Sequence, residues 1–125
     1  MTEFELTDFF KGIVDSEEGP IVICNMDYRI IYLNPAAMDY YKSGHEMQGK
    51  LLESFMNEEL MSMVRMSVEW FKEGRDNNRV FAFHDNKKNL DMYILAIRNG
   101  SGDLIGFYGR EESRTPDQSR PFDLD

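Results

Sequence analysis

The chain has 125 residues, of which 42% are hydrophobic and 13% aromatic, so it holds enough apolar material for one domain with a packed core. Its formal net charge of −9 opposes a phosphate backbone and argues against nucleic-acid binding. Cys24 is the only cysteine, which excludes an internal disulfide, and no apolar run approaches the about 20 residues of a membrane span. The acidic N-terminus does not resemble a secretory signal, and a single cysteine fits a reducing cytoplasm, so we expect a cytoplasmic protein without membrane contact.

The first expected element is an amphipathic helix over residues 3–15. Thr2 and Glu5 have the spacing of a capping box. Two short strands, 21–24 and 29–33, follow and are expected to form a hairpin. Asn34 then predicts the N-cap of a helix that runs to about residue 41, because Pro35 fits a first helical position. The apolar face of the first helix contains Leu6, Phe9, Phe10, Ile13 and Val14.

The second half of the chain begins with the longest expected helix. Asn57 predicts its N-cap, and Gly74 predicts its end. Beyond Gly74 the pattern alternates, which predicts strands over 79–84, 90–97 and 104–110. This order of elements predicts an α+β fold, with a five-stranded antiparallel sheet and the central helices over one face.

Four segments resemble PAS domains. The stretch from Pro20 to Ala37, ending in Asn-Pro-Ala-Ala, is similar to the family's opening strand, acidic turn, second strand and helix start. Glu46-Met-Gln-Gly-Lys50 resembles the family's Glu-x-x-Gly-Lys segment, residues 52–55 its next apolar stretch, and residues 96–106 its final hairpin. The resemblance covers roughly residues 3–111. It implies a PAS core over 17–112, preceded by the amphipathic helix (1–16) and followed by a polar, flexible tail (113–125).

Members of that family sense light, redox state, gas or metabolites through a core cavity, or pair with another PAS domain. The resemblance therefore implies a sensory or signalling module rather than an enzyme. Because the tail after Glu112 is short and polar, we expect the module to stand alone, without an attached output domain. It would bind a small apolar or amphipathic ligand, form a homodimer, or do both, and it would act in trans on a signalling protein. Two alternatives stay open: a pure protein-interaction module with a filled core, and a small α+β enzyme. The sequence shows no nucleophile elbow and no phosphate-binding loop, so no catalytic residue is proposed.

The identity of any cofactor is left open, although two groups are disfavoured. Covalent flavin chemistry in this family needs a reactive cysteine in the central helices, whereas Cys24 lies in an expected strand. Haem sensors of the family usually use a histidine of the long helix, and residues 57–74 contain none. His45 and His84 have no partners at the spacing of a zinc or iron site, so no metal ligand is proposed.

Candidate cavity-lining residues come from the apolar positions of the central helices and strands. They are Met38, Tyr41, Phe55, Val64, Val68, Phe71, Phe81, Phe83, Tyr93, Leu95 and Phe107. Because both faces of the expected strands are apolar, both faces of the sheet need a cover. We assign the open face to the side bearing Val80, Met92 and Leu104, and expect the first helix to pack there in a homodimer.

Overall fold

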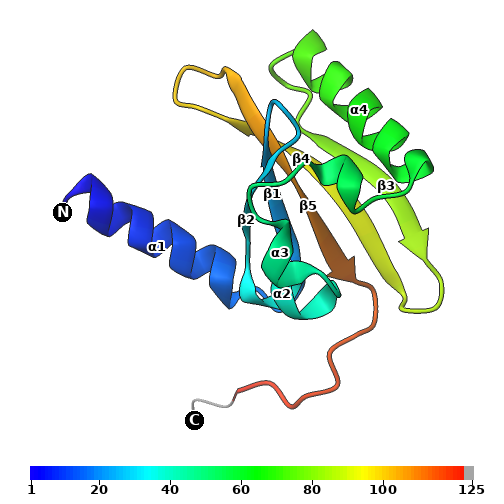
Figure 1. The fold of residues 1–125 in the computed structure, drawn as a ribbon. Helices are drawn as coiled ribbons and strands as arrows, with labels where there is room; N and C mark the ends of the chain where they lie inside the picture. Colours follow the sequence, from blue (N-terminus) through cyan, green and yellow to red (C-terminus); the bar gives the residue numbers. More distant parts are fainter. Residues whose placement is uncertain (123–125) are drawn as a thin grey trace.

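Along residues 1–122, which the computed structural model describes, the elements follow the expected order (Figure 1). The helical elements are α1 (Glu3–Ser16), α2 (Pro35–Tyr40), α3 (Gly44–Met47), the 3₁₀ turn η1 (Leu52–Ser54) and α4 (Glu58–Glu73). The strands are β1 (Ile21–Asn25), β2 (Ile30–Leu33), β3 (Arg79–Asp85), β4 (Leu90–Arg98) and β5 (Leu104–Ser113). The expected tail, 113–125, begins at the last residue of β5, and its residues 123–125 lie outside the described part.

The strands form one five-stranded sheet in the order β2-β1-β5-β4-β3, with every neighbouring pair antiparallel. The α+β prediction is therefore confirmed. The first and last strands in sequence, β1 and β5, lie side by side at the centre, where Cys24 is opposite Phe107. The hairpin of β3 and β4 forms one edge, and its register shifts by one residue between Phe81 and Phe83.

Side-chain caps explain where the three longer helical segments begin. Thr2 and Glu5 form the expected capping box, with both backbone-to-side-chain distances at 3.1 Å. The Oδ1 atom of Asn34 accepts a hydrogen bond from the Ala37 amide at 3.0 Å, and that of Asn57 accepts one from the Leu60 amide at 2.8 Å. Each helix start depends on residues that are close together in sequence, which is why the sequence predicted all three.

The central helices cover one face of the sheet, and the core fills the space between (Figure 1). Phe71 of α4, Ile30 of β2 and Ile94 of β4 are among its fully buried side chains. The open face was assigned wrongly: Val80 and Leu104 pack against this core, and Met92 lines a small cavity in it. Since β4 is apolar on both sides, its alternation alone does not tell which side faces the helices.

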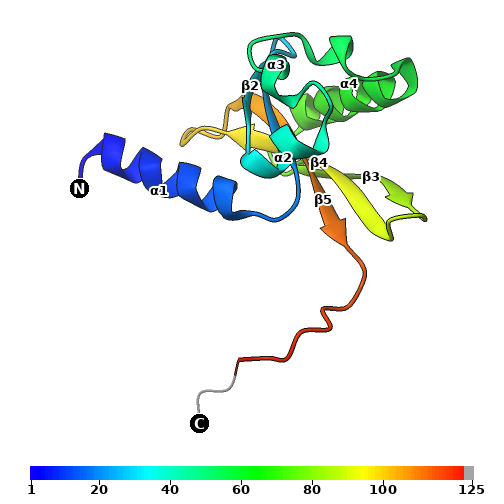
Figure 2. The ribbon, with the colours of Figure 1, turned by 60° about the horizontal axis from the view of Figure 1, so that its bottom comes forward.

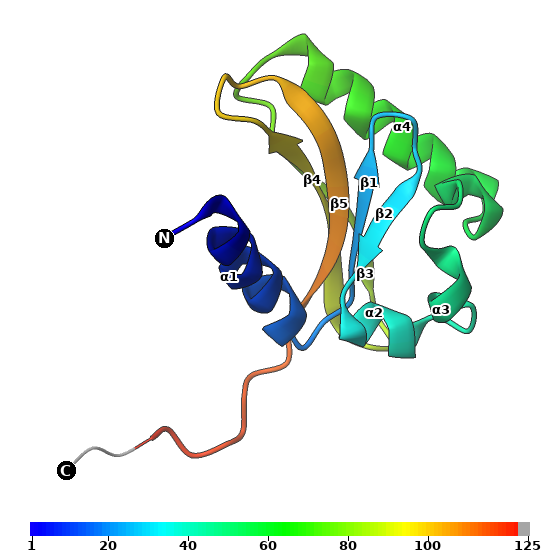
Figure 3. The ribbon, with the colours of Figure 1, turned by 60° about the vertical axis from the view of Figure 1, so that its left-hand side comes forward.

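The N-terminal helix lies on the other side of the sheet from α2, α3 and α4 (Figure 3). Only its C-terminal end approaches the sheet, and the rest projects away from the domain (Figure 2). None of its residues is buried. Within the described residues, no helix has the combined length and apolarity of a membrane span.

Candidate functional site

The last turn of α1 is tied to the domain by two side chains that begin far away in sequence. Asn34 is fully buried, and its Nδ2 donates hydrogen bonds to the carbonyls of Val14 and Gly19, each at 3.1 Å. The hydroxyl of Tyr32 on β2 donates to Asp15, which also pairs with Lys11 at 3.0 Å. The Tyr32 and Lys11 hydrogen bonds hold the pKa of Asp15 below its usual value. The helix therefore leaves the domain from a fixed base.

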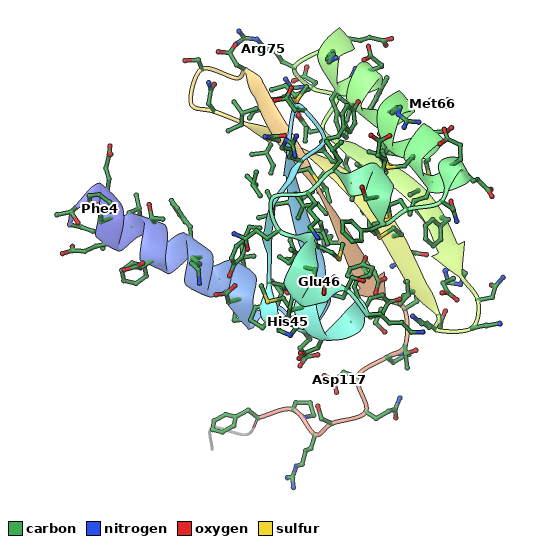
Figure 4. The ribbon with its side chains drawn as sticks, viewed as in Figure 1. Phe4, His45, Glu46, Met66, Arg75 and Asp117 are labelled. Atoms are coloured by element: carbon green, nitrogen blue, oxygen red, sulfur yellow. The ribbon has the colours of Figure 1, made fainter. Side chains whose placement is uncertain are left out.

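Beyond that base, the apolar stripe of α1 faces solvent. Phe9, Phe10 and Ile13 are 61%, 59% and 60% exposed, and Leu6 is also exposed. Phe4, near the far end of the helix, points away from the sheet (Figure 4). Exposed apolar stripes of this kind are uncommon on the surfaces of monomeric soluble proteins.

A groove runs between the base of α1 and the sheet face that the central helices leave uncovered. The hollow has a volume of about 480 Å³ and is lined mainly by apolar side chains. Its walls include Ile13, Val14, Ile21, Ile23, Ile97 and Tyr108. The wall residues come from α1 and from β1, β4 and β5, so this outer face of the sheet offers a concave apolar surface next to the exposed helix.

Two arginines mark the outer face towards the β3 edge. The guanidinium of Arg79 stacks over the Tyr93 ring at 4.1 Å, and that of Arg110 lies 5.8 Å from it. Arg110 also forms an ion pair with Glu112 at 3.7 Å. By contrast, residues 3–18 carry six carboxylates and one lysine. The exposed helix is thus strongly acidic, and the sheet face beyond its base carries cationic groups.

The core cavity holds little free space. It measures about 40 Å³, enough for a few water molecules but far below the ~300–1,000 Å³ of typical ligand pockets. Among the predicted lining residues, Tyr41, Val64 and Phe107 border it. Four others lie in or against the same core, without bordering this space: Met38, Phe55, Val68 and Phe71.

The remaining four predicted lining residues lie outside that core. Tyr93 and Phe81 form an aromatic pair beside Arg79 on the outer face, with their ring centroids 5.6 Å apart. Leu95 is opposite Tyr108, which borders the outer groove. Phe83 is opposite Met92 but is 41% exposed at the sheet edge, because the bulge between Phe81 and Phe83 breaks the alternation that the prediction assumed.

Cys24 and the group formed by His84, Asp91 and Arg114 have structural roles. Burial raises the pKa of the Cys24 thiol to about 12, which leaves it un-ionised and inert at neutral pH. His84 bonds to the nearly buried Asp91 at 2.6 Å, and Arg114 holds the second oxygen of that carboxylate. His45 is exposed on α3, and the described residues contain no cluster of three or more potential metal ligands.

Sequence reasoning missed the groups that fix and surround α1. It identified Asn34 as a cap but gave no sign of its bonds to Val14 and Gly19. The roles of Tyr32 and of the two arginines depend on which strands become neighbours, and no local motif reports that. The identity of the α1 stripe itself was visible in the spacing of its apolar residues.

The sheet order and the layered arrangement define a small α+β domain with helices over one face and an exposed helix on the other. The chain belongs to the PAS family: a family model described as PAS fold matches residues 14–115. No curated protein matches the chain. The PAS identity indicates a module of the sensory and signalling class, and such domains are generally sensors rather than enzymes.

Solved structures show the same fold at low sequence identity. The C-terminal domain of a Streptococcus mutans protein has a TM-score of 0.68 and 19% identity, with coverage of 86% of this chain and 84% of that one. A PAS domain from Colwellia psychrerythraea has a TM-score of 0.63 and 12% identity, with coverage of 86% and 96%. A sensory box sensor histidine kinase from Vibrio cholerae has a TM-score of 0.58 and 14% identity, with coverage of 90% and 92%.

Proposed function

We propose that this PAS domain is a protein-interaction module that pairs with a second copy of itself through α1 and the outer face of the sheet. The observation that carries the proposal is the exposed stripe of Phe9, Phe10 and Ile13 beside a groove of about 480 Å³. In a two-fold symmetric dimer, α1 of each subunit would enter the groove of the other subunit. The same contact would then form twice and would bury the apolar stripe and the groove of both subunits.

Charge supports the same pairing. In the described structure, the carboxylates of Glu3, Glu5 and Asp8 in the first half of α1 form no ion pair. Across the axis this half of α1 would approach the outer face that bears Arg79 and Arg110. Opposite charges on the helix and on the sheet face favour the association of the two subunits and determine which way the helix runs across the sheet.

A ligand in the core has less support. The space beside Tyr41 and Val64 measures about 40 Å³, so a metabolite would fit only if α4 or α2 moved away from the sheet. A filled core leaves surfaces, rather than a cavity, as the means of signalling to a partner. Native mass spectrometry of the purified protein distinguishes the two functions, since a retained small molecule would favour the ligand.

Sedimentation of the intact chain tests the dimer. We expect a dimer at tens of micromolar and a monomer for the variant Phe9→Asp, Phe10→Asp, because two buried carboxylates without partners are strongly unfavourable. Met66→Asp is the matched control: Met66 is an exposed apolar residue of α4, and its replacement should leave the dimer intact. A monomeric intact protein, or a double variant that remains dimeric, contradicts the proposal.

A further inference from the structure

A second exposed apolar surface lies on α4, far from α1 and its groove. A hollow of about 420 Å³ runs between α4 and β3, with Met63, Met66 and Trp70 on the helix side and Val80 on the strand side. Met66 is 73% exposed and Trp70 41% exposed. The Met66 side chain lies on the solvent-exposed side of α4 (Figure 4). Flexible thioethers beside an indole make an adaptable apolar surface.

The spacing of these residues is that of a helix–helix seam. Met63, Met66 and Trp70 are separated by three and four residues, and the same alternation continues to Glu59 before them and Glu73 after them. Met66 and Trp70 lie off the face that packs on the sheet, which contains Val64, Val68 and Phe71, whereas the half-buried Met63 lies at the border and also packs against the core. The helix therefore has one seam inside the domain and a second seam facing out.

The ends of the outer seam are acidic. In the described structure no ion pair involves Glu59 or Glu73, whereas Glu58 and Glu69 elsewhere on α4 are paired with Arg65 and Lys72. An apolar centre with a carboxylate at each end matches a helix that has an apolar centre and a cation at each end. The two cations would be about four helical turns apart, or ~21 Å.

The same charges argue against this chain as its own partner. Two α4 helices packed antiparallel about Met66 would set Glu59 of one against Glu73 of the other, and parallel packing would set each glutamate against its own copy. The helix α1 of a second copy is acidic as well. We infer that the groove between α4 and β3 docks a basic amphipathic helix of a different protein.

Trp70 is the only tryptophan of the chain, so its emission reports directly on the groove. The probes are two synthetic helical peptides of about 18 residues that contain no tryptophan and share a row of leucines along one face. One peptide has a lysine at each end of this row, and the other has a glutamate at the same positions. We expect the lysine-flanked peptide to shift Trp70 emission to shorter wavelength in a saturable way. The glutamate-flanked peptide should bind about tenfold more weakly.

Charge reversal supplies the decisive variant. In the double variant Glu59→Lys, Glu73→Lys, the preference should switch to the glutamate-flanked peptide. The control Glu18→Lys, Glu46→Lys makes the same change of net charge elsewhere on the protein and should keep the preference for the lysine-flanked peptide. The inference is overturned if neither peptide gives a saturable shift, if both bind equally, or if the control weakens binding as much as the reversal. It is also overturned if Trp70 emission changes with protein concentration in the absence of peptide and if Met66→Asp abolishes that self-association.

Discussion

Asn34 joins three segments, and its removal should destabilise the protein well beyond the loss of one helix cap. Its Oδ1 accepts hydrogen bonds from the amides of Ile21 at 2.8 Å and Ala37 at 3.0 Å, while its Nδ2 serves Val14 and Gly19. A cap alone contributes about 1 kcal/mol. In Asn34→Ala, two amides in a buried site lose their acceptor, and each costs about 1–3 kcal/mol.

The expected loss of unfolding free energy is therefore about 3 kcal/mol, which corresponds to a Tm lower by about 10 °C. Urea denaturation followed by Trp70 emission measures it. Asn57→Ala is the matched control, because Asn57 is also an N-cap but is exposed and makes a single cap bond, at 2.8 Å to Leu60. Its loss should be about 1 kcal/mol. Equal losses for the two variants would show that the buried bonds of Asn34 add nothing to its cap.

Two further outcomes follow from titratable groups. The hydrogen bond from His84, with a smaller contribution from Arg114, holds the pKa of Asp91 below its usual value. The ionised carboxylate therefore stabilises the fold at pH values above its unfolded pKa. That stabilisation is lost as the pH falls through the folded pKa. The urea midpoint of Asp91→Asn should therefore fall less than that of the intact chain between about pH 5 and pH 3, and parallel falls would contradict this. Burial raises the pKa of Cys24 to about 12, so an aromatic disulfide reagent should label it at least about a hundredfold faster in urea than in the folded state. Rapid labelling of the folded protein would show that the thiol is accessible.

The sequence was most informative where structure is decided locally. The caps at Thr2, Asn34 and Asn57, the alternation in β3 to β5 and the four PAS-like segments together predicted the elements and the fold. Local preference and tertiary structure agree at these positions, which is typical of well-specified folds.

The details that determine which apolar surfaces are exposed depend on long-range contacts. Alternation in β4 is apolar on both sides, so Tyr93 and Leu95 were placed in the core although they face outward. The bulge before Phe83 has no glycine or proline to signal it. Tyr32 meets Asp15 only because β2 forms the sheet edge near the end of α1. Which surfaces remain exposed becomes visible only once the strands are in order.

The most direct test of the α1-mediated pairing is an isotope-filtered NMR experiment on a mixture of labelled and unlabelled chains. It detects contacts between the rings of Phe9 and Phe10 in one subunit and the methyl groups of Ile23 and Ile97 in the other. We expect such intersubunit contacts in the intact protein, and we expect their loss in Phe9→Asp, Phe10→Asp. A dimer whose intersubunit contacts involve neither α1 nor the outer sheet face would contradict it.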